Sequence, residues 1–327
     1  DRSNIFELNK KRFWKNMYQL KPDITSTIND VGFANGLIHL HNLHGMDLTW
    51  DDLLRIADRF PVVWTLHDLW AISSNDQHPY NGTGSIPTKK RQFILHPNVH
   101  LSTPTQWLQD RIYQKTKKLP WLVKYGIDTE VFCPGSKEIA SKTVGLDPTR
   151  KRILFLAKNP ERNPYKDLNT LIKAWEIAND NLDSNGYDLY CLGGTPSTEK
   201  CKDHYFKILP VSTIDREIAA IINSCDLVIH STLNDNSPLS ILEAMGCKVP
   251  VIASSVGGIH ELLLSGKAGW LVQVKNPDQL AQEIVRFATG PRYHEQKTDV
   301  AYKKVITEHS LSAMRDAYLG LYAQITA

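Results

Sequence analysis

Short, continuously apolar runs that alternate with helical segments are the feature that most constrains the fold of this chain. The expected strands are 37–41, 62–66, 99–102 and 121–123 in the first half, and 153–157, 187–192, 227–230, 249–253 and 268–274 in the second. Strands that are apolar on both faces are typical of parallel sheets covered by helices on both sides. The sequence therefore predicts an α/β protein with two doubly wound parallel sheets.

A chain of 327 residues is long enough for two domains, each with its own core. The sequence turns polar after Pro134, so we expect domains at 1–134 and 135–327, with the final helix, at about 311–325, packing back on the first domain. The first 35 residues contain no clear buried strand, and the chain starts at Asp1 without a methionine. We therefore expect the N-terminal domain to be incomplete.

The composition indicates an ordinary soluble globular protein, with 42% hydrophobic and 22% charged residues. A formal charge of +3 gives no argument for nucleic acid binding, and no apolar run is long enough to span a bilayer. Five scattered cysteines argue against a zinc site or a disulfide framework and fit a reducing cytoplasm. A basic segment, residues 10–15, fits either peripheral contact with an anionic membrane or an ordinary surface helix.

The stretch 233–258 carries the clearest functional pattern. Ser237 is a good N-cap and Pro238 suits the first helical position, which predicts a helix from Pro238 to about Met245. The start of that helix would present unpaired N–H groups to a phosphate. Asp235 precedes the helix and Glu243 lies inside it, so the pattern indicates a ligand with both phosphate and hydroxyl groups, such as a nucleotide-sugar.

Histidines follow the expected strands of the first half. His41, His44 and His67 fall at carboxyl ends of these strands, where parallel sheets bind ligands, and Asp68 follows directly. Residues 73–97 are predicted to form a loop with a basic patch at 89–91. This loop fits either contacts to an acceptor or a merely solvated surface.

Six blocks of the sequence, in order, resemble the family 4 glycosyltransferases, and most closely their exopolysaccharide and colanic-acid branch. The blocks are HLHNLHG (39–45), PVVWTLHDLW (61–70), STPTQWLQD (102–110), YGIDTEVFCP (125–134), 235–258 and SLSAMRDAYLGLY (310–322). The resemblance implies the GT-B fold, in which two Rossmann-like domains face each other across a cleft. The family's first strand and its Gly-rich loop have no counterpart in the first residues of this chain.

The resemblance also implies roles for individual residues. Asp235 occupies the position of the first acid of the family's Glu-x7-Glu motif, which binds sugar hydroxyls, and Glu243 occupies that of the second, which binds ribose. Lys166 matches the family's diphosphate-binding lysine, Lys158 replaces its arginine, and Arg162 is a possible substitute for that arginine.

His67 would hydrogen-bond the donor sugar near its reacting carbon, so it and Asp235 are the catalytic candidates. The backbone around Ser237, Leu239 and Ser240 would hold phosphate, while Gly257 and Gly258 would allow close approach to the ligand or simply make a turn. The acceptor-side candidates are His41, His44 and Asp68.

The resulting expectation is a retaining, hexosyltransferase-type enzyme of surface polysaccharide biosynthesis that uses a UDP- or GDP-sugar. It would act in the cytoplasm, at the inner face of the membrane if the basic segment binds there, on a saccharide or lipid-linked acceptor. The chain contains no Asp-x-Asp pair, so we expect no metal and no cofactor beyond the donor substrate. A non-catalytic nucleotide-sugar-binding subunit of the same fold is the alternative, and a GT-B phosphorylase or epimerase is a weaker one.

Overall fold

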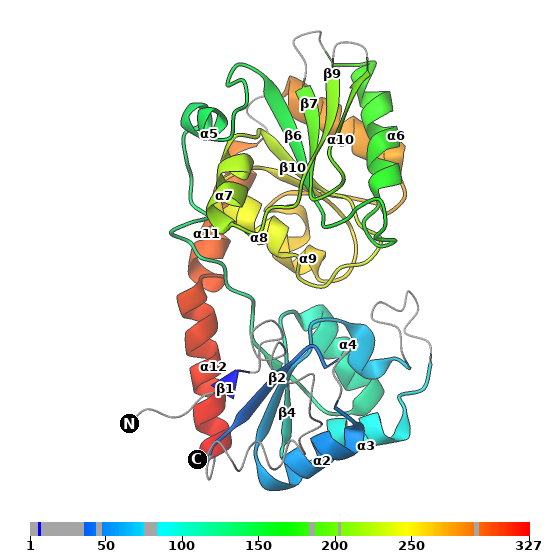
Figure 1. Cartoon of the computed structure of the whole chain (residues 1–327), viewed down its shortest axis with the longest axis vertical. Helices are drawn as coiled ribbons and strands as arrows, with labels where there is room; N and C mark the ends of the chain where they lie inside the picture. Colours follow the sequence, from blue (N-terminus) through cyan, green and yellow to red (C-terminus); the bar gives the residue numbers. More distant parts are fainter. Residues whose placement is uncertain are drawn as a thin grey trace, which may run out of the picture. The chain divides into compact units, whose positions relative to one another are not determined.

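The computed structural model describes residues 6–7, 36–43, 48–74, 84–182, 187–201, 204–290 and 294–327, which form two compact units (Figure 1). Unit 1 comprises the residues up to Lys124 together with 315–327, and unit 2 comprises Tyr125–Met314. The observed boundary precedes the predicted one near 134, because Ile127 and Phe132 are already buried in the core of unit 2. The basic segment 10–15 and His44 lie outside the described residues.

Unit 1 contains a parallel sheet with the strand order β1-β2-β3-β4-β5 among the described residues. A two-residue strand that the sequence analysis did not identify precedes residue 36, since Phe6–Glu7 pairs with β2. The strands are β1 (Phe6–Glu7), β2 (Ile38–His41), β3 (Val62–Thr65), β4 (Val99–Thr103) and β5 (Trp121–Leu122), and the helices are α2 (Trp50–Arg59), η2 (Leu69–Ile72), α3 (Thr88–Leu95), α4 (Gln106–Thr116) and most of α12 (Leu311–Thr326).

Helix α3 corrects the prediction of a loop over residues 73–97. Phe93 and Ile94 are buried in the core of unit 1 and anchor the helix. Lys90, predicted to lie in an exposed basic patch, is instead only 1% exposed. Its ammonium group donates to the carbonyls of Trp70 and Ser73 and lies 3.7 Å from the centre of the Trp70 ring. Burial of the ammonium group lowers the Lys90 pKa to about 8. The hydrogen bonds and the contact with the Trp70 ring offset part of the cost of burying this charge.

Unit 2 contains a sheet with the strand order β12-β11-β10-β6-β7-β9-β8 among the described residues. All pairs are parallel except β8 with β9. Its strands are β6 (Lys151–Leu156), β7 (Tyr187–Leu192), β8 (Ser197–Cys201), β9 (His204–Leu209), β10 (Leu227–His230), β11 (Val251–Ser254) and β12 (Trp270–Val272), and its helices are α5 (Lys137–Thr143), α6 (Leu168–Asn179), α7 (Asp215–Asn223), α8 (Leu239–Gly246), α9 (Ile259–Leu262), η3 (Leu264–Gly266), α10 (Pro277–Thr289) and α11 (Glu295–Glu308).

Helices cover both faces of this sheet. Residues of α6 and α10 pack on one face, and residues of α7, α8 and α11 pack on the other (Figure 1). The order of the strands reverses between β6 and β10, because the chain adds strands on one side of β6 and later on the other. Such a reversal opens a crevice at the carboxyl ends of the two strands, where α/β proteins bind ligands.

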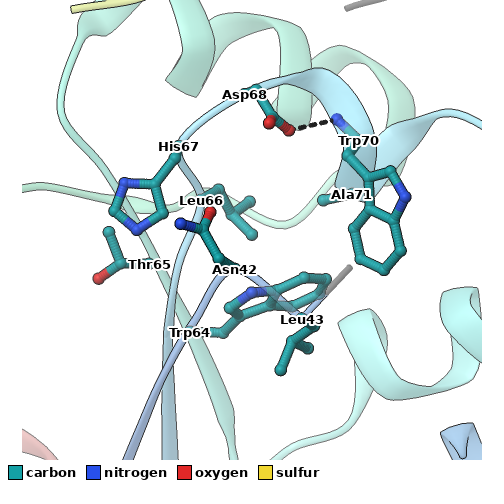
Figure 2. Close-up of a pocket in the computed structure, with 9 residues that line it drawn as sticks. All are labelled: Asn42, Leu43, Trp64, Thr65, Leu66, His67, Asp68, Trp70 and Ala71. Atoms are coloured by element: carbon teal, nitrogen blue, oxygen red, sulfur yellow. Dashed lines mark hydrogen bonds between the residues drawn. The ribbon is translucent and has the colours of Figure 1, made fainter. Parts of the chain in front are cut away.

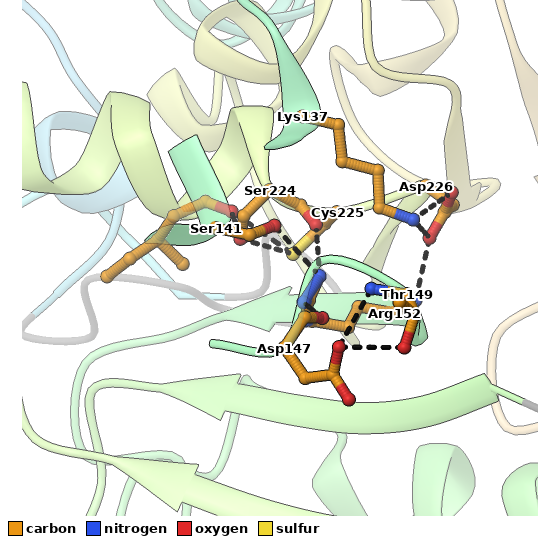
Figure 3. A network of polar contacts seen from close by, with 9 residues as sticks. Lys137, Ser141, Asp147, Thr149, Arg152, Ser224, Cys225 and Asp226 are labelled. Carbon is orange, nitrogen blue, oxygen red and sulfur yellow. Dashed lines mark hydrogen bonds and ion pairs between the residues drawn. The ribbon is translucent and has the colours of Figure 1, made fainter. Parts of the chain in front are cut away.

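A buried polar network secures the opposite, amino-terminal ends of β6 and β10 (Figure 3). The guanidinium group of Arg152 is 1% exposed and donates to the carbonyl oxygens of Ser224, at 2.8 Å, and Asp147. The Asp226 carboxylate accepts from the Arg152 backbone N–H at 2.7 Å and from Lys137 Nζ at 2.8 Å. Because every polar group named here has a partner, we interpret this network as structural.

Among the described residues, the structure contains no helix with the length and apolar character needed to cross a membrane.

Candidate functional site

The loops that follow β6 and β10 are joined by backbone hydrogen bonds. Leu233 N–H donates to the Tyr165 carbonyl at 2.8 Å, and Asp167 N–H donates to the Ser231 carbonyl at 3.2 Å. Lys166 and Thr232 form an antiparallel bridge between the two loops. The loop that carries the predicted phosphate-binding lysine therefore lies directly against the loop that carries the predicted sugar-binding acid.

Lys166 and Asp235 form an ion pair across this junction. The lysine Nζ lies 2.7 Å from the carboxylate Oδ2, and the side chains are 19% and 20% exposed. Burial alone would raise the pKa of Asp235, but the charge of Lys166 and the hydrogen bond from His230 hold this pKa below its usual range. Asp235 is consequently ionised at neutral pH.

His230, the last residue of β10, is a site residue that the sequence analysis missed. Its side chain is 2% exposed and its Nε2 lies 3.1 Å from Asp235 Oδ2. Its Nδ1 lies 3.2 Å from the Ser240 hydroxyl. One signal was available, since a histidine closes an otherwise apolar strand that ends beside the motif.

Helix α8 begins one residue later than predicted, with Pro238 rather than Ser237 at the N-cap and no side-chain cap. Pro238 has an extended ψ of 121°, so it does not enter the helix. Ser237 is 7% exposed, and its hydroxyl has no hydrogen-bond partner within the described residues. Leu239, in the first turn, is 46% exposed. The first backbone N–H groups of α8 lack partners within the helix, as at any helix start.

Glu243 lies within α8 and is partly buried, while its neighbours Leu242 and Ala244 in that helix are fully buried. Burial, and secondarily the negative charge of Asp215, raise the Glu243 pKa from 4.5 to about 7. A partly buried acid with such a pKa differs from an acid on a solvated helix face. Near neutral pH this carboxyl group can both accept and donate hydrogen bonds.

Gly257 packs directly against the backbone of the Asp235 loop. Its φ is +60°, and a Cβ atom added there would lie 1.8 Å from the Asp235 carbonyl oxygen. The glycine therefore allows the close backbone packing between this turn and the Asp235 loop. Gly258, the N-cap of α9, has φ −79° and ψ −1°, which any residue can adopt.

Lys158 and Arg162, the other predicted diphosphate contacts, both lie in the loop after β6 and are exposed. The structure thus brings Lys166, Asp235, Ser237, Ser240 and Glu243 to one end of the unit 2 sheet, with Lys158 and Arg162 on the same loop as Lys166.

In unit 1, His67 Nε2 lies 3.0 Å from His41 Nδ1, so two of the predicted residues are in contact. Asp68 accepts a hydrogen bond from the Trp70 backbone N–H at 2.8 Å and caps η2 (Figure 2). His67 and Asp68 line a small pocket with Asn42, Leu43, Trp64, Thr65, Leu66, Trp70 and Ala71. Its cavity volume of about 10 Å³ corresponds to about one water molecule.

A second histidine that the sequence analysis passed over, His39, lies beside His41, with the ring centres 4.2 Å apart. His39 Nε2 lies 2.7 Å from the Thr65 hydroxyl and Nδ1 lies 2.6 Å from the Tyr322 hydroxyl of α12. Burial and the neighbouring histidines lower the His39 pKa to about 3. His39 therefore contributes a neutral polar link between the sheet and α12 within unit 1.

The described residues include no cluster of three or more His, Cys, Asp or Glu side chains that could hold a metal ion.

Comparisons with known proteins find similarity to glycosyltransferases. Residues 150–289 match the family model "Glycosyl transferases group 1". The relatives include D-inositol 3-phosphate glycosyltransferases of Corynebacterium glutamicum (23% identical, covering 76% of this chain and 62% of the relative) and Rhodococcus opacus (26% identical, 80% and 60%). The chain thus spans less than two thirds of the length of these two relatives.

Solved structures share the fold. A glycosyltransferase from Rickettsia africae has a TM-score of 0.73 at 15% identity and covers 98% of this chain and 84% of its own. HepE of Anabaena, in complex with UDP-glucose, has a TM-score of 0.69 at 17% identity, with 92% and 82% covered. Residues 150–289 are thus similar to the glycosyl transferases group 1, and the fold is α/β of the GT-B type, of which the chain covers part.

Proposed function

We propose that this protein is a retaining glycosyltransferase that transfers a hexose from a UDP- or GDP-sugar to a saccharide or lipid-linked acceptor in surface polysaccharide biosynthesis. The observation that carries the proposal is the convergence of Lys166, Asp235, Glu243 and the start of α8 at the reversal between β6 and β10. A cation, two acids and a helix start are the groups that a diphosphate joined to two hydroxylated rings requires.

In this proposal the diphosphate lies over the start of α8, whose backbone N–H groups and dipole stabilise the departing negative charge. Lys166 adds a full positive charge, and Lys158 and Arg162 can reach the same region from their exposed loop. Glu243 holds ribose hydroxyls, and Asp235 holds a hydroxyl of the transferred sugar. His67 is assigned the hydrogen bond near the reacting carbon, with His41 and Asp68 on the acceptor side.

Retention of configuration is proposed without a protein nucleophile, with a donor phosphate oxygen assisting deprotonation of the acceptor. These charges are supplied by side chains and a helix start, so transfer is expected to proceed without a metal ion. Treatment with EDTA should leave the rate unchanged, and loss of activity that Mg²⁺ or Mn²⁺ restores would exclude this part of the proposal.

The donor assignment is tested by titrating UDP-glucose and a GDP-hexose into the protein in a calorimeter. The wild type should bind one of them, and Glu243→Ala should abolish detectable binding because the ribose loses its hydrogen-bond partner. Glu138→Ala, which changes an exposed glutamate of α5, is the matched control and should bind normally. Unchanged affinity in Glu243→Ala would exclude the assignment.

The acceptor needs a separate screen. Oligosaccharides and polyprenyl-linked sugars follow from the proposed pathway, whereas inositol phosphates follow from the names of the curated relatives. Product formation with inositol phosphate alone would replace surface polysaccharide as the pathway while leaving the transferase assignment intact.

A non-catalytic nucleotide-sugar-binding subunit is the second candidate. It is favoured by one observation, namely that Lys166 is already paired with Asp235 while Lys158 stands where the family has an arginine. This candidate predicts donor binding without sugar transfer or donor hydrolysis, so either reaction by the intact protein would exclude it.

A further inference from the structure

We propose that His230 is a positioning residue of the donor site, which fixes Asp235 and Ser240 so that both present only hydrogen-bond acceptors to the hydroxyls of the transferred sugar. This inference rests on the proposed function and concerns the same site. It gives the Ser240 hydroxyl a role separate from the phosphate contact proposed for the backbone at that position.

The direction of each hydrogen bond follows from the charges. Asp235 is ionised, so its carboxylate can only accept, and His230 Nε2 must carry the proton across the 3.1 Å contact. Burial, together with the charge of Lys166, lowers the His230 pKa and keeps the ring neutral, although Asp235 opposes this effect. A neutral ring protonated at Nε2 has an accepting Nδ1, so the Ser240 hydroxyl donates across the 3.2 Å contact.

Asp235 and Ser240 each keep a hydrogen-bond acceptor position that a ligand can use. Asp235 Oδ2 accepts from both Lys166 and His230, which fills its two lone-pair positions. Oδ1 accepts from the Asn236 backbone N–H at 2.9 Å and keeps one position. The proton of Ser240 is committed to His230, so its oxygen can only accept further bonds. A ligand hydroxyl can donate to either position, whereas a phosphate oxygen is repelled by both.

His230 acts through its neighbours, since its own side chain is 2% exposed and does not reach a ligand. The site therefore discriminates within a nucleotide-sugar. Hydroxyls meet Asp235 Oδ1 and Ser240 Oγ, and phosphate meets the backbone of α8 and Lys166. Removing His230 frees the serine proton and one lone pair of Asp235, so it weakens recognition of the sugar more than that of the diphosphate.

Two variants separate the two contacts of the imidazole. In His230→Gln the amide can still donate to Asp235, and in His230→Asn the shorter amide can still accept from Ser240. We expect either variant to bind UDP-glucose about tenfold more weakly, which corresponds to the loss of roughly one hydrogen bond. Binding of UDP alone should change less than about threefold by the same argument. His294→Gln, in which the altered histidine contacts the Phe287 carbonyl, is the control and should bind both ligands as the wild type does.

A measurement without ligand keeps the inference testable if the variants fail to fold. In NMR spectra of protein labelled with ¹⁵N-histidine, the His230 signals are those that are absent in His230→Gln or shifted in Ser240→Ala. From pH 6 to 8 they should show a neutral ring protonated at Nε2. A ring protonated at Nδ1, a charged ring, or equal losses for UDP and UDP-glucose would overturn the inference. If the expected tautomer is found but the wild type binds neither ligand, the proposed function fails and the assigned hydrogen-bond directions remain.

Discussion

Replacing Glu243 by glutamine should change how stability depends on pH. The folded protein raises the Glu243 pKa from 4.5 to about 7, so between these values the folded chain retains a proton that the unfolded chain has lost. The free energy of unfolding of the wild type therefore carries a contribution that is complete below pH 4.5 and is lost as the pH rises towards 7. A difference of about 2.5 between the two pKa values corresponds to roughly 3 kcal/mol, of which about 2 kcal/mol falls between pH 5 and pH 8.

Glutamine has a similar shape and does not ionise, so Glu243→Gln lacks this contribution. Relative to the wild type, the variant should gain about 2 kcal/mol of unfolding free energy between pH 5 and pH 8. All five cysteines lie between residues 125 and 314, so protection of thiols from a brief labelling pulse at fixed pH, after equilibration in urea, reports on unit 2 alone.

Glu138→Gln is the matched control for this series, since that side chain is 66% exposed and lies on α5. The control should follow the wild type at every pH. If Glu243→Gln also kept a constant difference from the wild type between pH 5 and pH 8, the pKa of Glu243 would not be raised and the argument from its burial would be wrong.

Three further changes have definite expected outcomes. Gly257→Ala should lower the free energy of unfolding by at least about 2 kcal/mol, because its Cβ would meet the Asp235 carbonyl at a positive φ, whereas Gly320→Ala, whose Cβ would meet no atom within 4 Å, should not lower the midpoint of a thermal melt. Lys90→Met should lower the free energy of unfolding in urea by about 1–3 kcal/mol, because it removes the hydrogen bonds that Lys90 Nζ donates to the carbonyls of Trp70 and Ser73. The same variant should abolish the gain in stability between pH 8 and 10.5 that the lowered Lys90 pKa gives the wild type. Ser237→Ala should leave stability unchanged or raise it by up to about 1 kcal/mol, since its buried hydroxyl has no partner among the described residues, and calorimetry should show weaker UDP binding if that hydroxyl contacts phosphate.

Local patterns predicted those parts of the fold that depend on local interactions. The strands 187–192 and 227–230 were predicted with their observed bounds. Helix α3 was missed because three successive cations normally indicate solvent, and nothing nearby in the sequence indicates that Trp70 and Ser73 supply carbonyls to Lys90. The hairpin of β8 and β9 was missed because its polar residues lack an apolar run.

The residues of the donor site were predicted as separate points on a motif, but their connections were not. Lys166 and Asp235 are 69 positions apart, and their pairing depends on two loops that meet only when β6 and β10 are neighbours in the sheet. His230 was interpreted as the end of an apolar strand, because the sequence does not show that Asp235 and Ser240 are its hydrogen-bond partners. The cap at Ser237 was wrong by one residue because the backbone of Pro238 remains extended.

The contacts that join the loops after β6, β10 and β11 have a consequence for protein engineering. Tyr165 and Asp167 are tied to residues 231–233, Ser254 accepts from Thr232 N–H at 2.9 Å, and Gly257 packs on Asp235. A specificity loop transplanted from a relative into any one of these segments would arrive without its supporting neighbours. Exchanges of donor preference in this scaffold should therefore move residues 157–167, 231–240 and 254–258 as one cassette, and libraries that randomise a single loop should yield mostly unstable clones.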